Sequence, residues 1–407
     1  MADRKNKWVQ PRHKFIRNLV YPVLVPIILI KYGLKVDKFK NKGRQYFIML
    51  NHQTPMDQFF VGISFSGAVY YVATEDIFSN GFTSRLIKWL IAPIPIKKQL
   101  TDFRAVKNCL QVAKEGGTIA IAPEGNRTYS GKTESINPAI IKLARKLNLP
   151  VATYRIEGGY GVQPRWSDGT RRGRMHAYVS RVIEPEEYAA MTDEEFLKAI
   201  TDGIFVNEAQ KEASPKGIFR SNRRAEYIER IAYVCPFCGL SEFESKKNTF
   251  KCLKCGRTVN YGADKRLEGV GFDLPFEYFG DWYDFQNEYI NNLDPLAHCE
   301  EPLYRDEAKL IEVHLYESKE VLDKAAKLAL YGNRITVNEG TDKALSLDFD
   351  DVKAASVLGR NKLNIYYKDN VYQFKGGKRF NAVKYVNFYH RYKNITRGDN
   401  DGKFLGL

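Results

Sequence analysis

A histidine and an aspartate five residues apart are the first pair in this chain that could do acid–base chemistry. They lie in the run Asn51-His52-Gln53-Thr54-Pro55-Met56-Asp57, which follows a short apolar segment. Residues five apart on a regular helix diverge by about 140°, so His52 and Asp57 would not meet on one helix. Pro55 favours the first helical position, with Thr54 as the N-cap, and this places His52 in the loop ahead of the helix.

The chain can then fold His52 back towards Asp57. A carboxylate in that position could accept the imidazole Nδ1–H, fix the tautomer and leave Nε2 as a base. A second interpretation fits the same residues. Thr54 and Asp57 have the spacing of a capping box, and His52 would then be an ordinary loop residue.

A second candidate motif is Pro123-Glu124-Gly125-Asn126-Arg127. A glycine-containing turn beside an arginine offers backbone N–H donors and a planar guanidinium, which suit the binding of a phosphate group. Alone, the motif is ordinary turn chemistry. The motif gains weight because both it and the His52 loop follow a predicted strand.

The elements that must position these motifs alternate between strand and helix from about residue 45 to residue 210. Short apolar runs predict strands, and 3.6-residue spacing predicts helices between them. The strands are expected at 46–50, 68–73, 117–122 and 150–156, and the helices at 103–114 and 138–147. Such alternation predicts an α/β domain with a central sheet covered by helices, and ligands collect at the strand ends of these sheets.

Together, the two motifs resemble those of the glycerolipid acyltransferase family of 1-acylglycerol-3-phosphate O-acyltransferases (PlsC type). Members carry a His-x4-Asp motif and, some 70 residues on, a Pro-Glu-Gly-Thr-Arg motif. The likeness covers about residues 15–210 and includes Ile94-Pro95-Ile96-Lys97-Lys98. The chain departs from the family at Lys97-Lys98, where Asp-Arg is usual, and at Asn126, where Thr or Ser is usual.

The resemblance implies a mixed-sheet α/β acyltransferase domain that makes phosphatidic acid from lysophosphatidic acid. His52, oriented by Asp57, would take the proton of the acceptor hydroxyl, which would attack the thioester of acyl-CoA or acyl-carrier protein. The substrate-binding residues implied are Glu124, Gly125, Asn126 and Arg127, with Lys97 or Lys98 assisting. The same chemistry on glycerol 3-phosphate or on another lysophospholipid remains an alternative.

Four of the six cysteines form two Cys-x-x-Cys pairs, Cys235/Cys238 and Cys252/Cys255, with thirteen residues between the pairs. This spacing is typical of a four-thiolate Zn²⁺ site, which is structural because no coordination position stays open. The pattern predicts a small zinc ribbon, with a redox role as the alternative. Zinc ribbons are common in nucleic-acid-binding proteins, so a binding protein with an inactive acyltransferase domain is the rival function. We nevertheless expect no nucleic-acid partner.

The net charge of +15 over 407 residues predicts an anionic partner, and the charge is dense at the N-terminus. A basic stretch precedes the apolar run 19–30, which Pro22 and Pro26 interrupt. Twelve helical residues would span about 18 Å, less than a bilayer core of about 30 Å. We therefore expect residues 1–34 to lie in the membrane interface on anionic lipids, or else to form a buried helix.

The expected location is the cytoplasmic face of the cell membrane, with peripheral or monotopic attachment. No signal-peptide cleavage pattern is visible, and the paired cysteines favour a reducing compartment.

Five regions follow from these features: 1–34 the interface segment, 35–214 the acyltransferase domain, 225–262 the zinc ribbon, 263–304 an aromatic-rich connector and 305–407 a small α+β module. The last region has short predicted strands at 310–316, 326–330, 335–337, 345–349, 362–367 and 371–374, and a helix at 380–392. It faintly resembles a pleckstrin-homology (PH) or GRAM-like domain. Its basic residues could face lipid headgroups or be a solvated surface: Arg360, Lys362, Lys375, Lys378 and Arg379.

Overall fold

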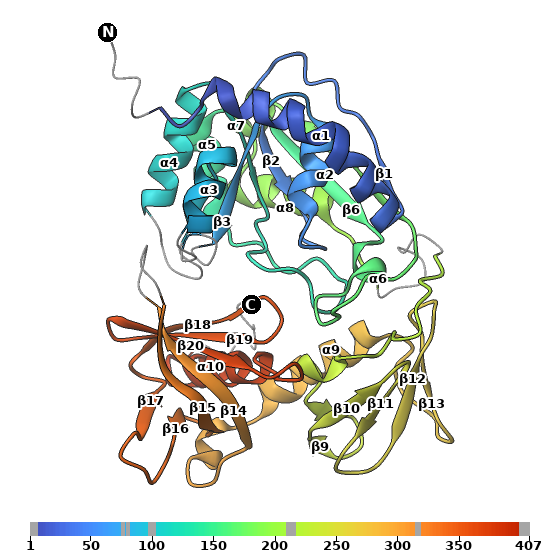
Figure 1. The fold of residues 1–407 in the computed structure, drawn as a ribbon, viewed down its shortest axis with the longest axis vertical. Helices are drawn as coiled ribbons and strands as arrows, with labels where there is room; N and C mark the ends of the chain where they lie inside the picture. The colour runs from blue at the N-terminus through green and yellow to red at the C-terminus, as the bar shows by residue number, and fades with distance from the viewer. Residues whose placement is uncertain are drawn as a thin grey trace. The chain divides into compact units, whose positions relative to one another are not determined.

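The computed structural model describes residues 7–74, 78, 82–96, 103–208, 217–313 and 319–398. The chain forms two compact units (Figure 1). Unit 1 comprises Met1–Pro164 and Gly169–Phe219, and unit 2 comprises Arg165–Asp168 and Arg220–Leu407. Lys97 and Lys98 lie outside the described residues, so their predicted role is a matter for experiment.

Unit 1 is built on a seven-stranded sheet in the order β1-β7-β6-β2-β5-β3-β4. Its strands are β1 (Leu34–Val36), β2 (Phe47–Leu50), β3 (Val69–Thr74), β4 (Ile94–Ile96), β5 (Thr118–Ile121), β6 (Val151–Glu157) and β7 (Met175–Ile183). The pairings among β6, β2, β5, β3 and β4 are parallel, whereas β7 runs antiparallel to β6. The predicted mixed sheet is therefore confirmed.

Helices cover both faces of this sheet (Figure 1). They are α1 (Pro11–Tyr32), α2 (Asp57–Ser64), α3 (Phe82–Ile91), α4 (Phe103–Lys114), α5 (Ala139–Leu147), α6 (Gly159–Val162), α7 (Pro185–Ala189) and α8 (Asp193–Ile204). Alternate residues of β2 feed two cores: Phe47 and Met49 pack in one cluster, and Ile48 and Leu50 in the other. Because side chains alternate along a strand, a fully apolar central strand is expected when both faces are covered.

The N-terminal helix is longer than the sequence predicted. Instead of a twelve-residue element, α1 runs unbroken through Pro22 and Pro26 for 22 residues and ends where Gly33 adopts φ 55°. At 1.5 Å per residue it spans about 33 Å. Within the described part of the chain, α1 is the one helix long and apolar enough to cross a membrane, judged by length and composition. The expectation that this segment is too short to span therefore does not hold for the helix as formed.

Unit 2 begins with small sheets around the cysteine pairs. The strands are β8 (Val234–Cys235), β9 (Gly239–Leu240), β10 (Phe243–Lys246), β11 (Thr249–Cys252), β12 (Thr258–Tyr261) and β13 (Leu267–Gly269). The short helix η3 (Ile228–Arg230) precedes them, and α9 (Phe279–Asn292) and η4 (Pro295–His298) follow. Trp282 of α9 is buried and donates its Nε1–H to the carbonyl of Val234 at 2.8 Å, which ties the aromatic connector to the cysteine-bearing strands.

The rest of unit 2 is a seven-stranded antiparallel sheet, in the order β17-β16-β15-β14-β20-β19-β18, followed by one helix. The elements are β14 (Tyr304–Glu312), β15 (Glu320–Leu330), β16 (Arg334–Val337), β17 (Leu345–Asp348), β18 (Val352–Leu358), β19 (Lys362–Tyr367), β20 (Asn370–Gly376) and α10 (Val383–Thr396). Strand β18 was not predicted from the sequence, because its two adjacent alanines weaken the strand signal. The likeness to a PH or GRAM domain stays a prediction.

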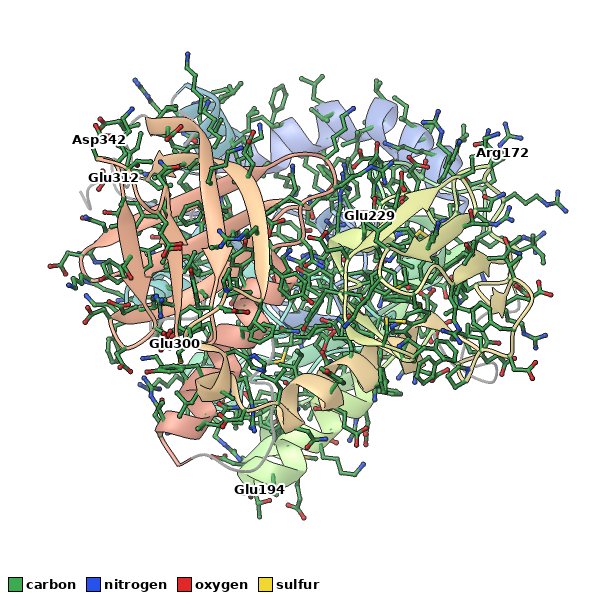
Figure 2. The ribbon with its side chains drawn as sticks, turned by 90° about the horizontal axis from the view of Figure 1, so that it is seen from below. Arg172, Glu194, Glu229, Glu300, Glu312 and Asp342 are labelled. Atoms are coloured by element: carbon green, nitrogen blue, oxygen red, sulfur yellow. The ribbon has the colours of Figure 1, made fainter. Side chains whose placement is uncertain are left out.

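Buried charges join the parts of unit 2. Arg230 is 3% exposed, and its guanidinium donates to the carbonyl of Trp166 and to Asp168 Oδ1, both at 2.7 Å, and to the carbonyl of Lys378 at 2.6 Å. Glu229, labelled in Figure 2, accepts a hydrogen bond from the Arg379 guanidinium. Arg360 also pairs with Asp168, at 3.2 Å. Two of the five basic residues considered for lipid contact, Arg360 and Arg379, are therefore paired with carboxylates of the same unit.

Candidate active site

The two motifs of unit 1 leave neighbouring strands at the same edge of the sheet. Strands β2 and β5 are parallel and pair Met49 with Ile121, one residue before the end of β2 and at the end of β5. Because parallel strands end on one side, the loops that follow them come together. The loop after β2 contains His52, and the loop after β5 contains Arg127.

His52 and Asp57 meet as the sequence predicted. The imidazole Nδ1 lies 2.8 Å from Asp57 Oδ2. The His52 side chain is 29% exposed, whereas that of Asp57 is 1% exposed. The pair therefore has a buried carboxylate and an imidazole that a substrate can reach from outside, which is the arrangement required of an oriented general base.

The local helix start differs from the prediction. Helix α2 begins at Asp57, two residues after Pro55, and Met56 in the N-cap position makes no side-chain cap. Thr54 instead donates its hydroxyl to Asp57 Oδ1 at 2.7 Å and its backbone N–H to the same carboxylate at 2.9 Å. The backbone N–H of Gln53 adds a bond of 2.7 Å to Oδ2. The contact of Thr54 with Asp57 and the contact of Asp57 with His52 therefore coexist, and a carboxylate at a helix N-terminus is well placed electrostatically.

Glu124 connects the two motif loops through their backbones. Its Oε1 accepts the N–H of His52 at 2.6 Å, and its Oε2 accepts the N–H of Glu134 at 2.7 Å. Glu124 is 5% exposed, and burial raises its pKa well above the usual range against the opposing effect of these two hydrogen bonds. A bond of 3.0 Å from the N–H of Thr128 to the carbonyl of His52 completes the link. Glu124 thus holds the backbone of the candidate base, and a direct contact with substrate stays a prediction.

The remaining residues of the second motif lie at the turn itself. Gly125 is exposed and has φ 70°, in the left-handed region that favours glycine. Asn126 is 4% exposed and Arg127 is half-buried. Arg127 directly precedes Thr128, the residue bonded to the backbone of His52, so its backbone lies in the loop that borders the dyad. An arginine on this loop is the residue type suited to bidentate binding of a phosphate group.

Two residues of the site were not predicted from the sequence. Asn51, fully buried, donates to the carbonyl of Ile156 at 2.8 Å and accepts the N–H of the same residue at 2.7 Å. Gln53, 1% exposed, accepts the N–H of Tyr160 at 2.9 Å. Both amides fasten the His52 loop to β6 and to the segment that follows it. The sequence did offer one signal for these two residues, since Asn51 and Gln53 directly flank His52 after an apolar strand.

The four cysteines of the predicted metal site also come together, in unit 2. Their Sγ atoms all lie within 4.8 Å of one another. A tetrahedral Zn²⁺ site with Zn–S bonds of about 2.3 Å needs S–S separations of about 3.8 Å. Cys235 and Cys255 are 3.7 Å apart and Cys238 and Cys252 are 3.6 Å apart, so the donor set fits a metal ion of this kind.

Comparison with known proteins supports an acyltransferase domain in the N-terminal half. The family model described as Acyltransferase matches residues 34–157, which include both motifs. The 1-acyl-sn-glycerol-3-phosphate acyltransferase of Bacillus subtilis is 21% identical over 207 residues, 50% of this chain and 98% of that protein. The chloroplastic 1-acyl-sn-glycerol-3-phosphate acyltransferase BAT2 of Brassica napus is 22% identical over 148 residues, 35% of this chain; the match spans 41% of that protein's length.

Among solved structures, the 1-acyl-sn-glycerophosphate (LPA) acyltransferase PlsC from Thermotoga maritima is similar, with 20% identity. It has a TM-score of 0.40 and covers 50% of this chain and 80% of that one. All three alignments leave about half of this chain or more unmatched.

Proposed function

We propose that this protein transfers an acyl group from acyl-CoA or acyl-carrier protein to the free hydroxyl of lysophosphatidic acid, giving phosphatidic acid. The observation that carries the proposal is the His52–Asp57 pair at 2.8 Å on a loop bonded through its backbone to the loop of Arg127. A base on one loop and an arginine on the loop bonded to it fit an acceptor that has a hydroxyl and a phosphate close together. Two relatives named as 1-acyl-sn-glycerol-3-phosphate acyltransferases match this chain, over 207 and 148 residues.

In the proposed reaction, Asp57 holds the Nδ1–H of His52, so Nε2 is the nitrogen that takes the proton of the acceptor hydroxyl. The hydroxyl oxygen attacks the thioester carbonyl and forms a tetrahedral intermediate. The intermediate collapses by expelling the donor's thiolate, which takes up the proton from His52. General-base assistance of this kind is worth about 10²- to 10⁴-fold in rate. Arg127 holds the acceptor phosphate, with Lys97 or Lys98 assisting.

The proposed resident metal is a structural Zn²⁺ held by Cys235, Cys238, Cys252 and Cys255. A bound ion would cross-link the β8–β9 segment, which carries Cys235 and Cys238, to the end of β11 and the turn after it, which carry Cys252 and Cys255.

The proposed setting is a membrane surface, with α1 as the attachment. Six apolar side chains of α1 are between 43% and 83% exposed: Phe15, Leu19, Val20, Val23, Ile27 and Ile30. An apolar stripe of this size on a soluble surface marks contact with a partner or a membrane. We propose attachment at the cytoplasmic face, on anionic lipids, without crossing the bilayer, because α1 is bonded to the rest of unit 1 through Arg17 to the carbonyls of Gly62 and Phe65 and through Tyr32 to Gln163.

The test of the reaction is acyl transfer from acyl-CoA to lysophosphatidic acid by the wild type and by His52→Ala. The matched control is His176→Ala, because His176 also lies within hydrogen-bond distance of an aspartate in unit 1, at 2.9 Å from Asp37. We expect a loss of at least 10²-fold for His52→Ala and less than twofold for His176→Ala.

An inactive wild type calls for the same assay with acyl-carrier protein, glycerol 3-phosphate and other lysophospholipids. Activity on one of these acceptors and not on lysophosphatidic acid would correct the substrate. Full activity of His52→Ala would contradict the mechanism.

The test of the attachment is sedimentation with vesicles of phosphatidylcholine and phosphatidylglycerol. We expect Val23→Asp/Ile27→Asp to lose binding, since both side chains are more than half exposed and their replacement disturbs no core. Unchanged binding of this variant would contradict attachment through α1.

A further inference from the structure

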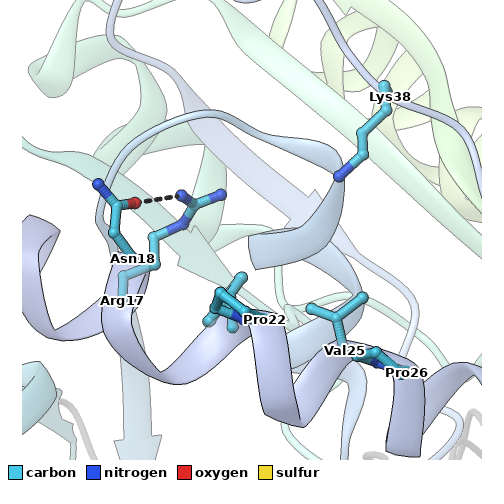
Figure 3. Close-up of a pocket in the computed structure, with 7 residues that line it drawn as sticks. Arg17, Asn18, Pro22, Val25, Pro26 and Lys38 are labelled. Atoms are coloured by element: carbon cyan, nitrogen blue, oxygen red, sulfur yellow. Dashed lines mark hydrogen bonds between the residues drawn. The ribbon is translucent and has the colours of Figure 1, made fainter.

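An open groove of 470 Å³ runs along one flank of α1 (Figure 3). Six of its lining residues come from α1 and one from the segment after β1: Arg17, Asn18, Tyr21, Pro22, Val25, Pro26 and Lys38. Its volume is in the range of small-molecule sites. All of these residues belong to unit 1, and none of the seven is acidic.

The groove has a cationic part and an apolar part. Arg17 and Lys38 supply the positive charge, and Pro22, Val25 and Pro26 supply the apolar surface. The nearest acidic residue in sequence, Asp37, is engaged elsewhere, at 2.9 Å from His176 and 3.7 Å from Lys35. The charge of the two cations is therefore not cancelled within the groove.

The two cations are held in place by the end of α2. Arg17 donates to the carbonyls of Gly62 at 3.0 Å and Phe65 at 2.9 Å, and Lys38 donates to the carbonyl of Ile63 at 2.7 Å. A helix C-terminus attracts cations, so these bonds fix both side chains. Lys38 is exposed, and its ammonium has three donors, of which this carbonyl takes one. The ammonium can therefore bind a phosphate group while it keeps its bond to the carbonyl of Ile63.

The groove adjoins the apolar stripe of α1. At 100° per residue, Pro22 and Pro26 lie next to Phe15 and Leu19, which are 68% and 66% exposed. When the stripe is buried among acyl chains, the flank with Arg17 and Lys38 comes to the level of the headgroups, as basic side chains at interfaces do. A phosphate and the start of an acyl chain would then meet the two parts of the groove at once.

We propose that this groove binds one phospholipid of the bilayer, with its phosphate on Arg17 and Lys38 and the beginning of an acyl chain along Pro22, Val25 and Pro26. This site rests on the proposed membrane association. It adds to that association a defined position for one lipid molecule. It is separate from the dyad, because Asp57 begins α2 and Arg17 contacts its far end, about 12 Å away over eight residues.

The first experiment measures binding of the full chain to phosphatidylcholine vesicles with phosphatidylglycerol. Lys38→Gln is compared with Lys35→Gln, which removes the same charge from an exposed side chain three residues away. We expect Lys38→Gln to weaken partitioning about fivefold and Lys35→Gln less than twofold. Asn18→Asp places a carboxylate in the groove without removing a bond to α2, and should weaken binding as much as Lys38→Gln.

Equal effects of Lys38→Gln and Lys35→Gln, with Asn18→Asp like the wild type, would overturn the site while leaving vesicle binding intact. A wild type that binds no vesicles would instead overturn the membrane association and the site with it.

The second experiment distinguishes a lipid from a free phosphate. Dihexanoyl phosphatidylglycerol, below its micelle concentration, is titrated into the wild type and Lys38→Gln by calorimetry, with and without inorganic phosphate. We expect the lipid to bind the wild type at least fivefold more tightly than the variant, and equimolar phosphate not to compete. Equal competition by inorganic phosphate would overturn the lipid assignment and leave a simple anion site.

Discussion

His52 and His176 each lie within hydrogen-bond distance of an aspartate in unit 1, His52 at 2.8 Å from Asp57 and His176 at 2.9 Å from Asp37. By distance alone the two pairs are alike. The exposed fractions of their carboxylates separate them: 1% for Asp57 and 47% for Asp37. The difference lies in what surrounds each carboxylate.

Asp57 begins a helix and accepts hydrogen bonds from the backbone of Gln53 and from both the backbone and the hydroxyl of Thr54. Asp37 follows the edge strand β1, and its charged neighbours are His176 and Lys35. The hydrogen bond from His176 lowers the pKa of Asp37. The charges of His176 and Lys35 lower it further, and slight burial opposes these effects. Both pairs therefore have a short contact between the imidazole and the carboxylate. Of the two carboxylates, Asp57 is the one that is buried and held by further hydrogen bonds.

This contrast indicates what the fold supplies to a general base. An exposed aspartate can turn away from its histidine or exchange it for water. A buried one with its other lone pairs occupied has no alternative position, so it fixes both the tautomer and the direction of the imidazole. The loop contacts of Asn51, Gln53 and Glu124 serve the same end, because they hold the backbone on which His52 stands.

The most direct test of this difference replaces the aspartate of each pair with asparagine, which removes the negative charge. We expect Asp57→Asn to lower kcat for acyl transfer by about 10²- to 10⁴-fold, because the amide favours the wrong imidazole tautomer. Asp37→Asn should stay within twofold of the wild type. Steady-state rates at pH 7.5, with thermal unfolding to show that both variants fold, give the answer. Equal losses in the two variants would mean that burial of the carboxylate is not the distinction.

A smaller effect is expected from Thr54→Val, which removes one donor to Asp57 and keeps the volume of the side chain. The bond of 2.7 Å from the Thr54 hydroxyl goes to a buried carboxylate, and such bonds are worth about 1.5–3 kcal/mol. We expect kcat to fall roughly tenfold, with KM for the acceptor changed by less than twofold. Thr201→Val is a matched control, because the Thr201 hydroxyl bonds only a helical carbonyl among the described contacts. A fall in activity shared by both variants would point to general destabilisation.

The two pairs also differ in how far a sequence can reveal them. His52 and Asp57 are five residues apart, so the motif and a proline between them were enough to predict their contact. His176 and Asp37 are 139 residues apart and meet only because β1 and β7 pair in parallel. The same limit hid the clamp between Asn51 and Ile156, which are 105 residues apart. Local chemistry can be predicted from spacing, whereas contacts across the sheet require its strand order.

Errors in the elements have equally physical causes. The predicted length of the N-terminal element counted the apolar run 19–30 alone, whereas α1 begins in the basic stretch at Pro11 and continues through Pro22 and Pro26 to Tyr32. Arg360 and Arg379 were considered as lipid contacts because they are basic, yet they pair with Asp168 and Glu229, which are far away in sequence. The four cysteines were predicted correctly as a cluster because metal-ligand spacing is itself a local signal.

A further test concerns the backbone of His52 rather than its ring. Glu124 has a pKa raised by burial, so the stability it contributes is fully present below its unfolded-state pKa of about 4.3 and is lost as the pH rises through the folded-state pKa. Relative to Glu124→Gln, the wild type should therefore be most stable near pH 4 and lose that advantage towards pH 8. At low pH we expect a difference of about 1–3 kcal/mol, since the hydroxyl oxygen of the neutral carboxyl can still accept a backbone N–H, whereas the NH₂ group of the amide cannot.

Chemical denaturation of the wild type and Glu124→Gln at pH 4.5, 6 and 8 measures the trend. His176 offers no counterpart, because its backbone is held by strand pairing in β7. A gap that widens with pH would mean that the two backbone hydrogen bonds outweigh burial at Glu124.

The smallest effect belongs to the exposed pair. Because the pKa of Asp37 is lowered in the fold, its contribution to stability is present above the unfolded-state pKa of about 3.9 and is lost as the pH falls through the lowered value. The pair is exposed and screened by solvent, so Asp37→Asn should cost no more than about 0.5 kcal/mol at pH 6 and less than that at pH 2.5. Denaturation at these two pH values, at low and high salt, measures it. A cost above about 2 kcal/mol that salt does not reduce would show that the Asp37–His176 pair stabilises the fold as strongly as a buried pair. The exposed fraction of the carboxylate would then not be the property that distinguishes the two pairs.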